Sequence, residues 1–405
     1  MTPVAVHVAY GGAHLLHATT AEKWRALALA AFETYVPEPG VLTAHFGTPE
    51  PIAPLVHARV RARLQSAGCL GSLRIDFEDG YGVRTDDEED AAAEAAARAA
   101  AAMLSLHSGE ALALGIRPKS FAGPTRARAV RTLDRFFGAL GRVPSGFVVT
   151  LPKVQTAHDV AVAVGTLATL EMRHAAAPLG LELMAETPEF FAALAAGGLH
   201  SFVAAAEGRL RSVHFGAYDL LSGLGVPGHA QALDHPFCMP LRLSLALAAA
   251  PLEIPVYDGA TLAMPVPPHR GEALSAAQRA ENNDAVLGAM ATHARSCEAA
   301  LALGFAGSWD LHPAQLVPRY VATTAFYLRA LPAVRTRLCA FLANAARATR
   351  AGQTFDDAAS ARGLQRFLVR GLDARVLDAA DLAGLPVPAD VLRLASFDEL
   401  VARSA

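Results

Sequence analysis

Eight short segments rich in Val, Ile, Leu and Phe recur along this chain, and each leads through a polar or glycine-containing end into a helix-forming stretch. Strands that alternate with helices favour a parallel sheet, and eight such units favour closure into a TIM-type (β/α)8 barrel of the α/β class. The 405 residues suffice for one barrel with an appendage, or for two ordinary domains. The segments lie near residues 3, 72, 111, 146, 179, 212, 253 and 304.

Two regions are longer than a minimal barrel requires. Residues 13–70 predict two helices, 21–36 and 51–68, with a Pro- and Gly-containing break between them, so the first crossover is enlarged. After the last strand, residues 314–350 predict two helices broken near Pro332, followed by a small helical tail. We therefore expect a barrel domain at 1–345 and a C-terminal helical extension at 346–405.

A run of acids opens the alanine-rich stretch at residues 86–104. We interpret it as a charged helix start, because the helix dipole favours negative charge at that end. The alternative is a metal or partner patch.

Charge and cysteine content exclude several classes of protein. The formal net charge is −3 and Lys and Arg form no basic stripe, so no nucleic-acid partner is expected. The N-terminal residues lack a secretory leader pattern and no internal stretch is apolar enough to cross a bilayer, so we expect a cytoplasmic protein without a membrane partner. Four cysteines stand far apart and predict reduced, mostly buried thiols rather than a zinc ribbon or disulfides: Cys69, Cys238, Cys297 and Cys339.

Two acids close consecutive apolar segments, Glu186 after residues 179–185 and Asp219 after residues 212–218. Neighbouring parallel strands place their C-terminal ends side by side, so two such carboxylates can converge on one hard cation. Oxygen ligands without Cys or paired His favour Mg²⁺, or Mn²⁺, over Zn²⁺. Two protein ligands leave room for a chelating substrate.

Nearly every other strand also ends in an ionisable group. Several carboxylates at one barrel mouth would repel each other unless cations compensate, and Arg117, Lys153 and a divalent ion would do so. The remaining charged or titratable strand-end residues are Asp76, Glu78, Asp79, Lys119, Asp258, Asp310 and His312.

Six ordered motifs within residues 3–345 resemble the strand-end motifs of the HpcH/HpaI aldolase and citrate lyase beta-subunit family, in an aldolase-like branch without an assigned substrate. This resemblance implies a phosphoenolpyruvate/pyruvate-type TIM barrel that binds Mg²⁺. It also implies a carbon–carbon lyase or aldolase acting through an enolate on a small 2-oxo or 3-hydroxy acid, either free or as a coenzyme A thioester. The motifs are RIDFEDGYG, GIRPKSF, LPKV, LMAETP, FGAYDL and GFAGSWDLHPAQ.

The resemblance also assigns residues. It places the metal on Glu186 and Asp219, and it gives Arg117 the carbonyl or carboxylate oxygen of the substrate. A metal and a guanidinium directed at the oxygen that becomes negative stabilise an enolate more than its neutral precursor. The residues with implied catalytic roles are Arg117, Asp79, Glu78 and, as a supporting charge, Lys153.

The first segment departs from the family pattern. Many relatives carry there a Pro-Gly or Pro-Ala-Asp segment with an Arg that helps bind coenzyme A, whereas this chain reads AYGGAHLLH. His14 is our candidate for a substrate contact in its place. Asp258 is a second candidate, which either orients a water or opens the turn before Gly259. His312 is either an acid or base, or a loop anchor before Pro313.

Two further expectations concern partners. A lengthened loop at residues 264–284 either narrows the mouth or serves a neighbouring subunit, and the resemblance implies a homo-oligomer, a trimer or hexamer, in which helices at 314–345 take part. The alternative from another class is a non-catalytic ligand-binding or scaffold subunit of a larger complex. A buried cluster of like charges without a ligand argues against it, because such a cluster is costly to retain.

Overall fold

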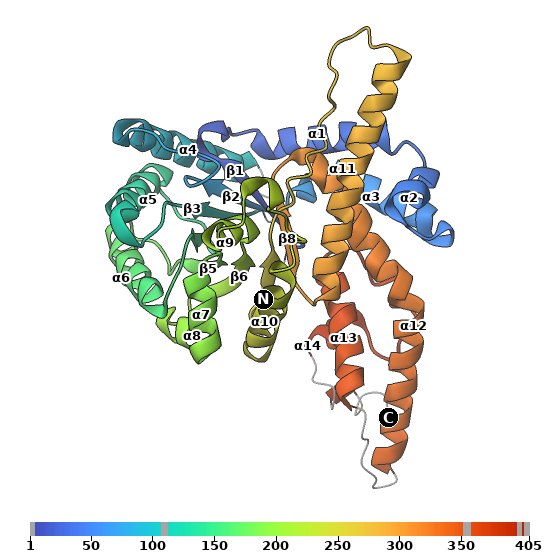
Figure 1. Ribbon diagram of the computed structural model, residues 1–405. Coiled ribbons are helices and arrows are strands. Elements are labelled where there is room, and N and C mark those ends of the chain that lie inside the picture. Colours follow the sequence, from blue (N-terminus) through green and yellow to red (C-terminus); the bar gives the residue numbers. More distant parts are fainter. Residues whose placement is uncertain (1–4, 107–111, 351–357, 395–398, 401–405) are drawn as a thin grey trace.

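Eight parallel strands close into a barrel in chain order, as expected (Figure 1). The computed structural model describes residues 5–106, 112–350, 358–394 and 399–400. Strand β1 pairs with both β2 and β8, which closes the sheet. The strands are β1 His7–Gly12, β2 Ser72–Asp76, β3 Ala113–Arg117, β4 Val148–Leu151, β5 Gly180–Ala185, β6 Leu210–Phe215, β7 Val256–Asp258 and β8 Gly307–Asp310.

Side chains fill the barrel interior. Arg74 on β2 donates two hydrogen bonds of 2.7 Å to Glu182 on β5, and the Thr150 hydroxyl donates a third, also of 2.7 Å. All three side chains are buried, and the salt bridge is stable there because its polar atoms are paired. This buried network joins β2, β4 and β5 inside the barrel.

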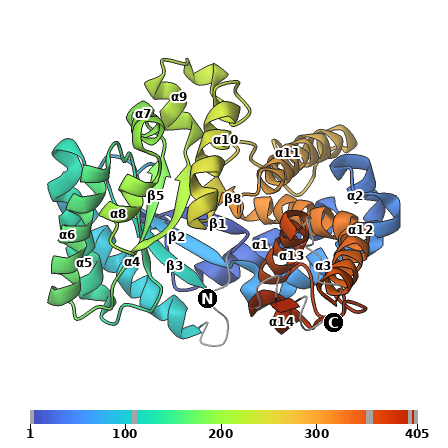
Figure 2. The same cartoon turned by 90° about the horizontal axis from the view of Figure 1, so that it is seen from below.

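Helices between the strands surround the barrel, and Figure 2 shows α4 to α10 around one side of it. Helices α1 to α3 and α11 to α14 gather on the other side as a helical lobe. One hydrophobic core cluster extends from the strands into that lobe. The helices from α4 to α11 are α4 Asp86–Leu106, α5 Arg126–Leu140, α6 Ala157–Arg173, α7 Pro188–Gly197, α8 His200–Ala205, α9 Ala217–Gly223, α10 Cys238–Ala249 and α11 Ala276–Ala302.

The enlarged first crossover contains α1 Thr20–Tyr35 and α3 Ala53–Gln65, close to the two predicted helices. The stretch between them is not simply a break, because it forms a further helix, α2 Pro39–Phe46. Proline is well suited to the first turn of a helix, and Gly47 ends this one in the left-handed conformation, with φ of 64°. The same Pro and Gly that predicted irregular structure therefore begin and end a short helix.

The predicted break at Pro332 is wrong, since α12 runs unbroken from Leu316 to Arg350. A proline removes one backbone hydrogen bond, and here packing against α3, α11 and α13 holds the helix together across it. The predicted domain division at residue 345 falls inside α12 and stays a prediction. The described part of the tail is helical, with α13 Ala358–Asp373 and α14 Ala389–Leu394.

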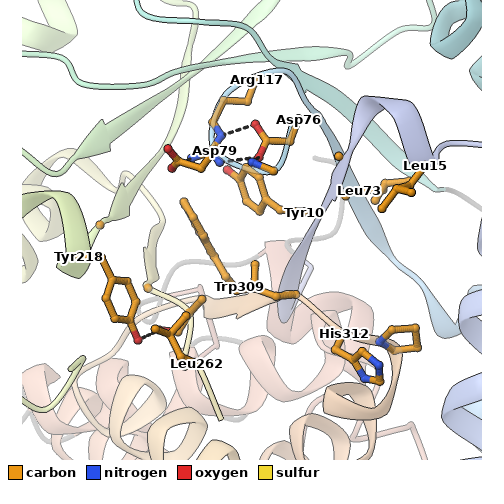
Figure 3. Close-up of a pocket in the computed structure, with 18 of the residues that line it drawn as sticks. Tyr10, Leu15, Leu73, Asp76, Asp79, Arg117, Tyr218, Leu262, Trp309 and His312 are labelled. Atoms are coloured by element: carbon orange, nitrogen blue, oxygen red, sulfur yellow. Dashed lines mark hydrogen bonds and ion pairs between the residues drawn. The ribbon is translucent and has the colours of Figure 1, made fainter. Parts of the chain in front are cut away.

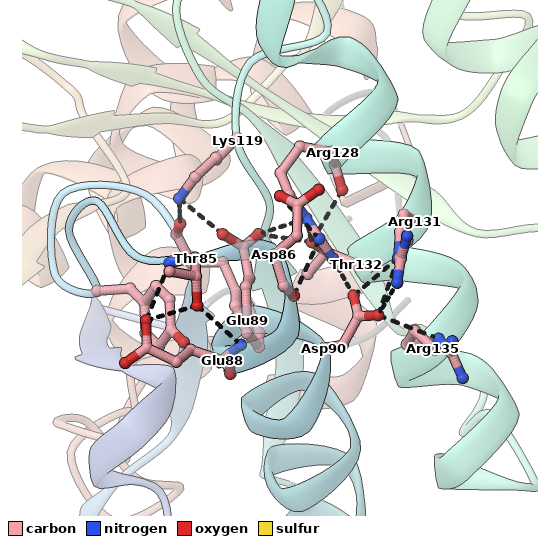
Figure 4. Close-up of polar contacts among 12 residues, drawn as sticks. Thr85, Asp86, Glu88, Glu89, Asp90, Lys119, Arg128, Arg131, Thr132 and Arg135 are labelled. Carbon is pink, nitrogen blue, oxygen red and sulfur yellow. Dashed lines mark hydrogen bonds and ion pairs between the residues drawn. The ribbon is translucent and has the colours of Figure 1, made fainter.

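The acidic run is a helix start, as interpreted from the sequence, and three of its acids, Asp86, Glu89 and Asp90, also contact residues of α5 (Figure 4). Glu89 is fully buried and lies 3.1 Å from the ammonium of Lys119. Asp90 accepts hydrogen bonds from Arg128 and Arg131 of α5. The cluster is thus a structural network.

The four cysteines are free thiols, three of them buried, as expected. Among the residues that the structure describes, no helix has the length and apolarity needed to span a membrane.

Candidate functional site

A cavity of about 960 Å³ opens at the C-terminal mouth of the barrel (Figure 3). Barrel enzymes place their reactive groups at this end of the strands. Its lining includes charged and aromatic side chains from β1, β2, β3 and β8 and from the segments that follow β2, β5 and β6. They are Tyr10, Asp76, Asp79, Arg117, Glu186, Asp219 and Trp309.

Arg117 ends β3 and is held by Asp76, which ends β2 at the same level of the sheet. Its Nε and Nη2 atoms donate hydrogen bonds of 2.7 and 2.6 Å to the two carboxylate oxygens of Asp76. The guanidinium carbon also lies 5.0 Å from the ring centroid of Tyr10 and 5.6 Å from that of Trp309. Although burial alone would lower the pKa of Arg117, Asp76 keeps that pKa well above its usual range. Arg117 is therefore a fixed positive charge in the cavity wall.

The third guanidinium nitrogen of Arg117, Nη1, faces the acidic motif after β2. It lies 3.5 Å from Oε2 of Glu78 and 3.5 Å from Oδ2 of Asp79. The ammonium of Lys153 also pairs with Glu78 and lies 3.7 Å from Asp79. The structure therefore brings together all four predicted catalytic residues.

Glu186 and Asp219 meet at the same cavity, and Lys153 lies beside both. The backbone N–H of Lys153 donates a 2.7 Å hydrogen bond to Oε1 of Glu186, while its ammonium lies 3.7 Å from Oδ1 of Asp219. Lys153 adopts a φ of 53°, which is rare for a residue with a side chain and directs this N–H to the carboxylate. Glu186 is buried, whereas Asp219, in the first turn of α9, is partly exposed.

Two glycines make room for these carboxylates. A Cβ at Gly216 would lie 2.5 Å from both Cβ and Oε2 of Glu186, so any larger residue would displace that side chain. A Cβ at Gly80 would lie 2.6 Å from Oδ2 of Asp76. Such close approaches require glycine.

The carboxyl groups carry perturbed pKa values. Burial raises the pKa of Glu186 to about 8, with Arg117 opposing that rise and Asp219 adding to it. Burial also raises the pKa of Asp219, against Lys153. Burial also raises the pKa of Glu78, to about 7. Burial would likewise raise the pKa of Asp79, but the hydrogen bond with Glu78 and the charge of Arg117 outweigh it, so the pKa of Asp79 is lowered. The neighbouring pair thus has one carboxyl with a raised pKa and one with a lowered pKa, a pattern typical of acid–base sites.

Other predicted residues lie elsewhere. Asp258 is fully buried, pairs with Arg242 of α10, and accepts a 3.0 Å hydrogen bond from the N–H of Gly259, so the structure does not bring it into the cavity. Burial raises the pKa of Asp258 to about 6 against the charge of Arg242. His14 is exposed and packs edge-on against Tyr81, outside the cavity lining. These positions support structural contacts for both residues, and their predicted substrate contacts stay untested.

The remaining strand-end residues also make structural contacts. His312 lines the cavity, yet its Nδ1 accepts a 3.2 Å hydrogen bond from the N–H of Ala314, the loop-anchoring alternative. Asp310 is buried and pairs with Arg319 and His293.

Sequence reasoning missed three residues of the site. The sequence indicates that Asp76 is a strand-end acid, but it gives no sign that Asp76 holds Arg117. Tyr10 and Trp309 stack on each other with their ring centroids 4.1 Å apart and pack below the guanidinium. Their only sequence signal is that each lies in an apolar segment next to a strand end.

The residues present fit a magnesium ion. Glu186 and Asp219 offer carboxylate oxygens in a place where burial raises both pKa values, so a cation would relieve an unfavourable concentration of acids. Within the described ranges, no group of three or more His, Cys, Asp or Glu side chains is arranged to hold a metal. Mg²⁺ commonly binds one or two carboxylates and completes its octahedron with water and substrate oxygens, whereas structural Zn²⁺ takes four protein ligands.

Comparisons with solved structures find proteins to which this chain is similar. A citrate lyase from Burkholderia xenovorans LB400 aligns over 83% of this chain and 93% of its own, with a TM-score of 0.52 and 20% identity. The citrate lyase beta subunit of M. tuberculosis, complexed with oxaloacetate and magnesium, aligns over 80% and 99%, with a TM-score of 0.42 and 18% identity. An HpcH/HpaI aldolase from Desulfitobacterium hafniense DCB-2 aligns over 69% and 88%, with a TM-score of 0.33 and 16% identity.

The protein is therefore a TIM barrel whose fold is similar to that of the citrate lyase from Burkholderia xenovorans LB400, which confirms the expected resemblance at the level of fold. Within that class, the chain belongs to the family described as Domain of unknown function (DUF6986), whose model matches residues 2–400. A search of curated proteins gives no match.

Proposed function

We propose that this protein is a Mg²⁺-dependent carbon–carbon lyase or aldolase that acts through an enolate on a 2-oxo or 3-hydroxy acid. One observation carries the proposal: the two carboxylates of Glu186 and Asp219 face the same cavity as the fixed guanidinium of Arg117. That combination provides a place for a hard cation and a second positive charge for one substrate oxygen.

The proposed metal would be held by Glu186 and Asp219. When bound, Mg²⁺ would act as a Lewis acid toward the carbonyl oxygen of the substrate. Arg117 binds the carboxylate or carbonyl oxygen through Nη1, the nitrogen that makes no hydrogen bond to Asp76 and that lies 3.5 Å from Glu78 and Asp79. Since the guanidinium is already fixed by Asp76 and two aromatic rings, little reorganisation is needed when negative charge develops on the substrate.

Cleavage of an aldol bond also requires a proton carrier. The hydroxyl proton of the substrate passes to a base, the bond between the two carbons breaks, and its electron pair forms the enolate, which then takes up a proton. We assign the carrier to Glu78 and Asp79, which share the contact with Lys153. Asp79 lines the cavity and presents its ionised carboxylate there, whereas Glu78, with a pKa of about 7, exchanges a proton near neutrality.

The test combines metal binding with turnover. Titration calorimetry should detect Mg²⁺ binding to the wild-type protein and its loss in Glu186→Gln and Asp219→Asn. A screen of oxaloacetate, glyoxylate and pyruvate, with and without acyl-CoA partners, for aldol cleavage or condensation should reveal an activity that the same variants and a chelator abolish. Asp284→Asn, which alters an exposed acid on α11, is the matched control and should change neither. Activity that persists in Glu186→Gln with a chelator present would contradict the proposal.

A further inference from the structure

The cavity is larger than its charged end requires. Pockets for drug-sized ligands measure about 300–1,000 Å³, and this cavity of about 960 Å³ lies at the top of that range. A small oxo acid that contacts Arg117 and Glu186 would leave most of the space unfilled. Figure 3 shows Arg117, Asp76 and Asp79 grouped together, with Leu15 and Leu262 lying away from them.

Apolar side chains line the part of the cavity away from this charged group. They come from the 3-10 helix η1 (Ala13–Leu15), the residue after it, α1, and the segment after β7. We call this surface the apolar rim, and its residues are Leu15, Leu16, Trp24, Leu27 and Leu262.

Three leucines of the apolar rim are unusually exposed. Leu15 is 63% exposed, Leu27 46% and Leu262 60%, although all three line the same cavity. Exposed apolar side chains that gather at one hollow are typical of a ligand-binding surface. The enlarged first crossover, between β1 and β2, supplies most of the apolar rim.

The apolar rim is poor in positive charge. Among the described residues that line the cavity, the Lys and Arg side chains are Lys23, on the exposed face of α1, and Arg117. Arg117 is assigned to the acid end of the substrate, so Lys23 is the remaining ammonium or guanidinium in the lining for the phosphates of a nucleotide handle. Phosphate recognition generally uses several such donors. The lining thus suits a hydrocarbon better than a phosphorylated group.

We propose that the substrate is a 2-oxo or hydroxy acid with a long apolar tail. The acid end lies against Arg117, beside the place where Glu186 and Asp219 would hold the metal, and the tail lies on the apolar rim. This inference rests on the proposed function, because it assigns the acid end to the proposed metal site. It adds the class of substrate and names the residues that select it.

The two tryptophans of the chain provide a direct test, because both line this cavity. Trp24 belongs to the apolar rim, and Trp309 packs below Arg117 at the charged end. In Trp309→Phe, the fluorescence of Trp24 reports occupation of the rim alone. If that variant folds poorly, calorimetry on the wild-type protein measures the same binding constants.

The experiment measures the Kd of pyruvate, 2-oxohexanoate and 2-oxodecanoate in the presence of Mg²⁺, with decanoate as the acid that lacks the oxo group. Each methylene that reaches the apolar rim should tighten binding about threefold to fourfold. The emission of Trp24 should respond to 2-oxodecanoate and not to pyruvate. Leu27→Asp should weaken 2-oxodecanoate by about tenfold or more and leave pyruvate unchanged. Leu247→Asp, at a 75% exposed leucine on α10 outside the cavity, is the control and should change neither.

The outcomes separate this inference from the proposed function. Equal affinities for pyruvate and 2-oxodecanoate, both dependent on Mg²⁺ and on Glu186, would overturn the inference and leave the proposed function standing. Affinity that rises with chain length, but is the same for decanoate and unaffected by Mg²⁺ or Glu186→Gln, would support the tail site and contradict the proposed function. Chain-length dependence together with Mg²⁺ dependence supports both.

Discussion

Asp76 holds Arg117 by two parallel hydrogen bonds of 2.7 and 2.6 Å, with both side chains buried at the mouth of the barrel. Asp76 also accepts hydrogen bonds from the backbone N–H groups of Glu78 and Gly80, at 2.9 and 2.8 Å. One carboxylate thus fixes both the guanidinium and the loop that carries Glu78 and Asp79. This makes Asp76 a positioning residue for the proposed chemistry.

We predict that Asp76→Asn lowers the free energy of unfolding by about 3 kcal/mol, because it removes one charge of a buried pair. Turnover should fall mainly in kcat, since Arg117 loses its fixed orientation, and kcat and circular-dichroism melts measure the two effects. Asp381→Asn is the control, because Asp381 also accepts two hydrogen bonds of 2.7 Å from one arginine, Arg59, and neither residue lines the cavity. The Arg59–Asp381 pair is more exposed than the Arg117–Asp76 pair, so this control should lose less stability and keep its kcat. A loss of stability in Asp76→Asn with an unchanged kcat would reject the positioning role.

Gly216 is predicted to be essential for the metal site. In Gly216→Ala the new Cβ would lie 2.5 Å from both Cβ and Oε2 of Glu186, so the Glu186 side chain must move away from its position. Mg²⁺ affinity should fall by about tenfold or more, measured by calorimetry. Gly165→Ala in α6 is the matched control, because nothing lies within 4 Å of its Cβ. There the substitution should raise stability by about 0.5–1 kcal/mol and leave Mg²⁺ binding unchanged.

The barrel could be predicted from the sequence because each strand is a separate apolar segment with a polar end. The position of Glu186 and Asp219 at one cavity could also be predicted, because consecutive parallel strands lie next to each other. By contrast, the contact of Asp76 with Arg117 depends on the register between β2 and β3, and apolar patterning alone does not determine register. Asp258 illustrates the same limit, since it turns to Arg242, a helical residue with no sequence signal for that contact.

The course of α12 could not be predicted for a different reason. Local propensity at Pro332 favours a break, and only the neighbouring helices, which are distant in sequence, reverse that preference. The stacking of Tyr10 on Trp309 likewise joins the first and last strands of the barrel, which come together only on closure.

His7 at the start of β1 should make the fold sensitive to acid. Burial lowers its pKa to about 4, although Asp310 partly opposes that shift, and its Nε2 accepts a 3.1 Å hydrogen bond from the N–H of Gly71. The unfolded chain binds a proton at His7 below about pH 6.5 and the folded chain does not. The contribution of about 3 kcal/mol is therefore fully present above pH 6.5 and is lost as the pH falls from 6.5 to 4.

Urea unfolding between pH 4 and 7 measures this dependence. The slope of the unfolding free energy against pH reports how many more protons the unfolded chain binds than the folded chain. In His7→Gln this number should decrease by about one over that interval. His158→Gln, at an exposed histidine on α6, should keep the wild-type slope. An unchanged slope in His7→Gln would show that other groups cause the acid sensitivity.

Lys153 should act in opposite directions on metal binding and on turnover. Its ammonium lies 3.7 Å from Asp219 and would repel a divalent cation bound there, whereas its backbone N–H holds Glu186 in place. Lys153→Met keeps the backbone N–H and removes the charge of the side chain. Because close charges in a partly buried site interact by a few kcal/mol before screening, Mg²⁺ affinity should rise by about tenfold. The same variant should lose most of its turnover, because Glu78 and Asp79 both lose the ammonium that lowers their pKa values. Calorimetry with Mg²⁺ and single-turnover kinetics on the same preparation distinguish these effects. A fall in both Mg²⁺ affinity and turnover would mean that Lys153 serves chiefly to hold the shape of the metal site.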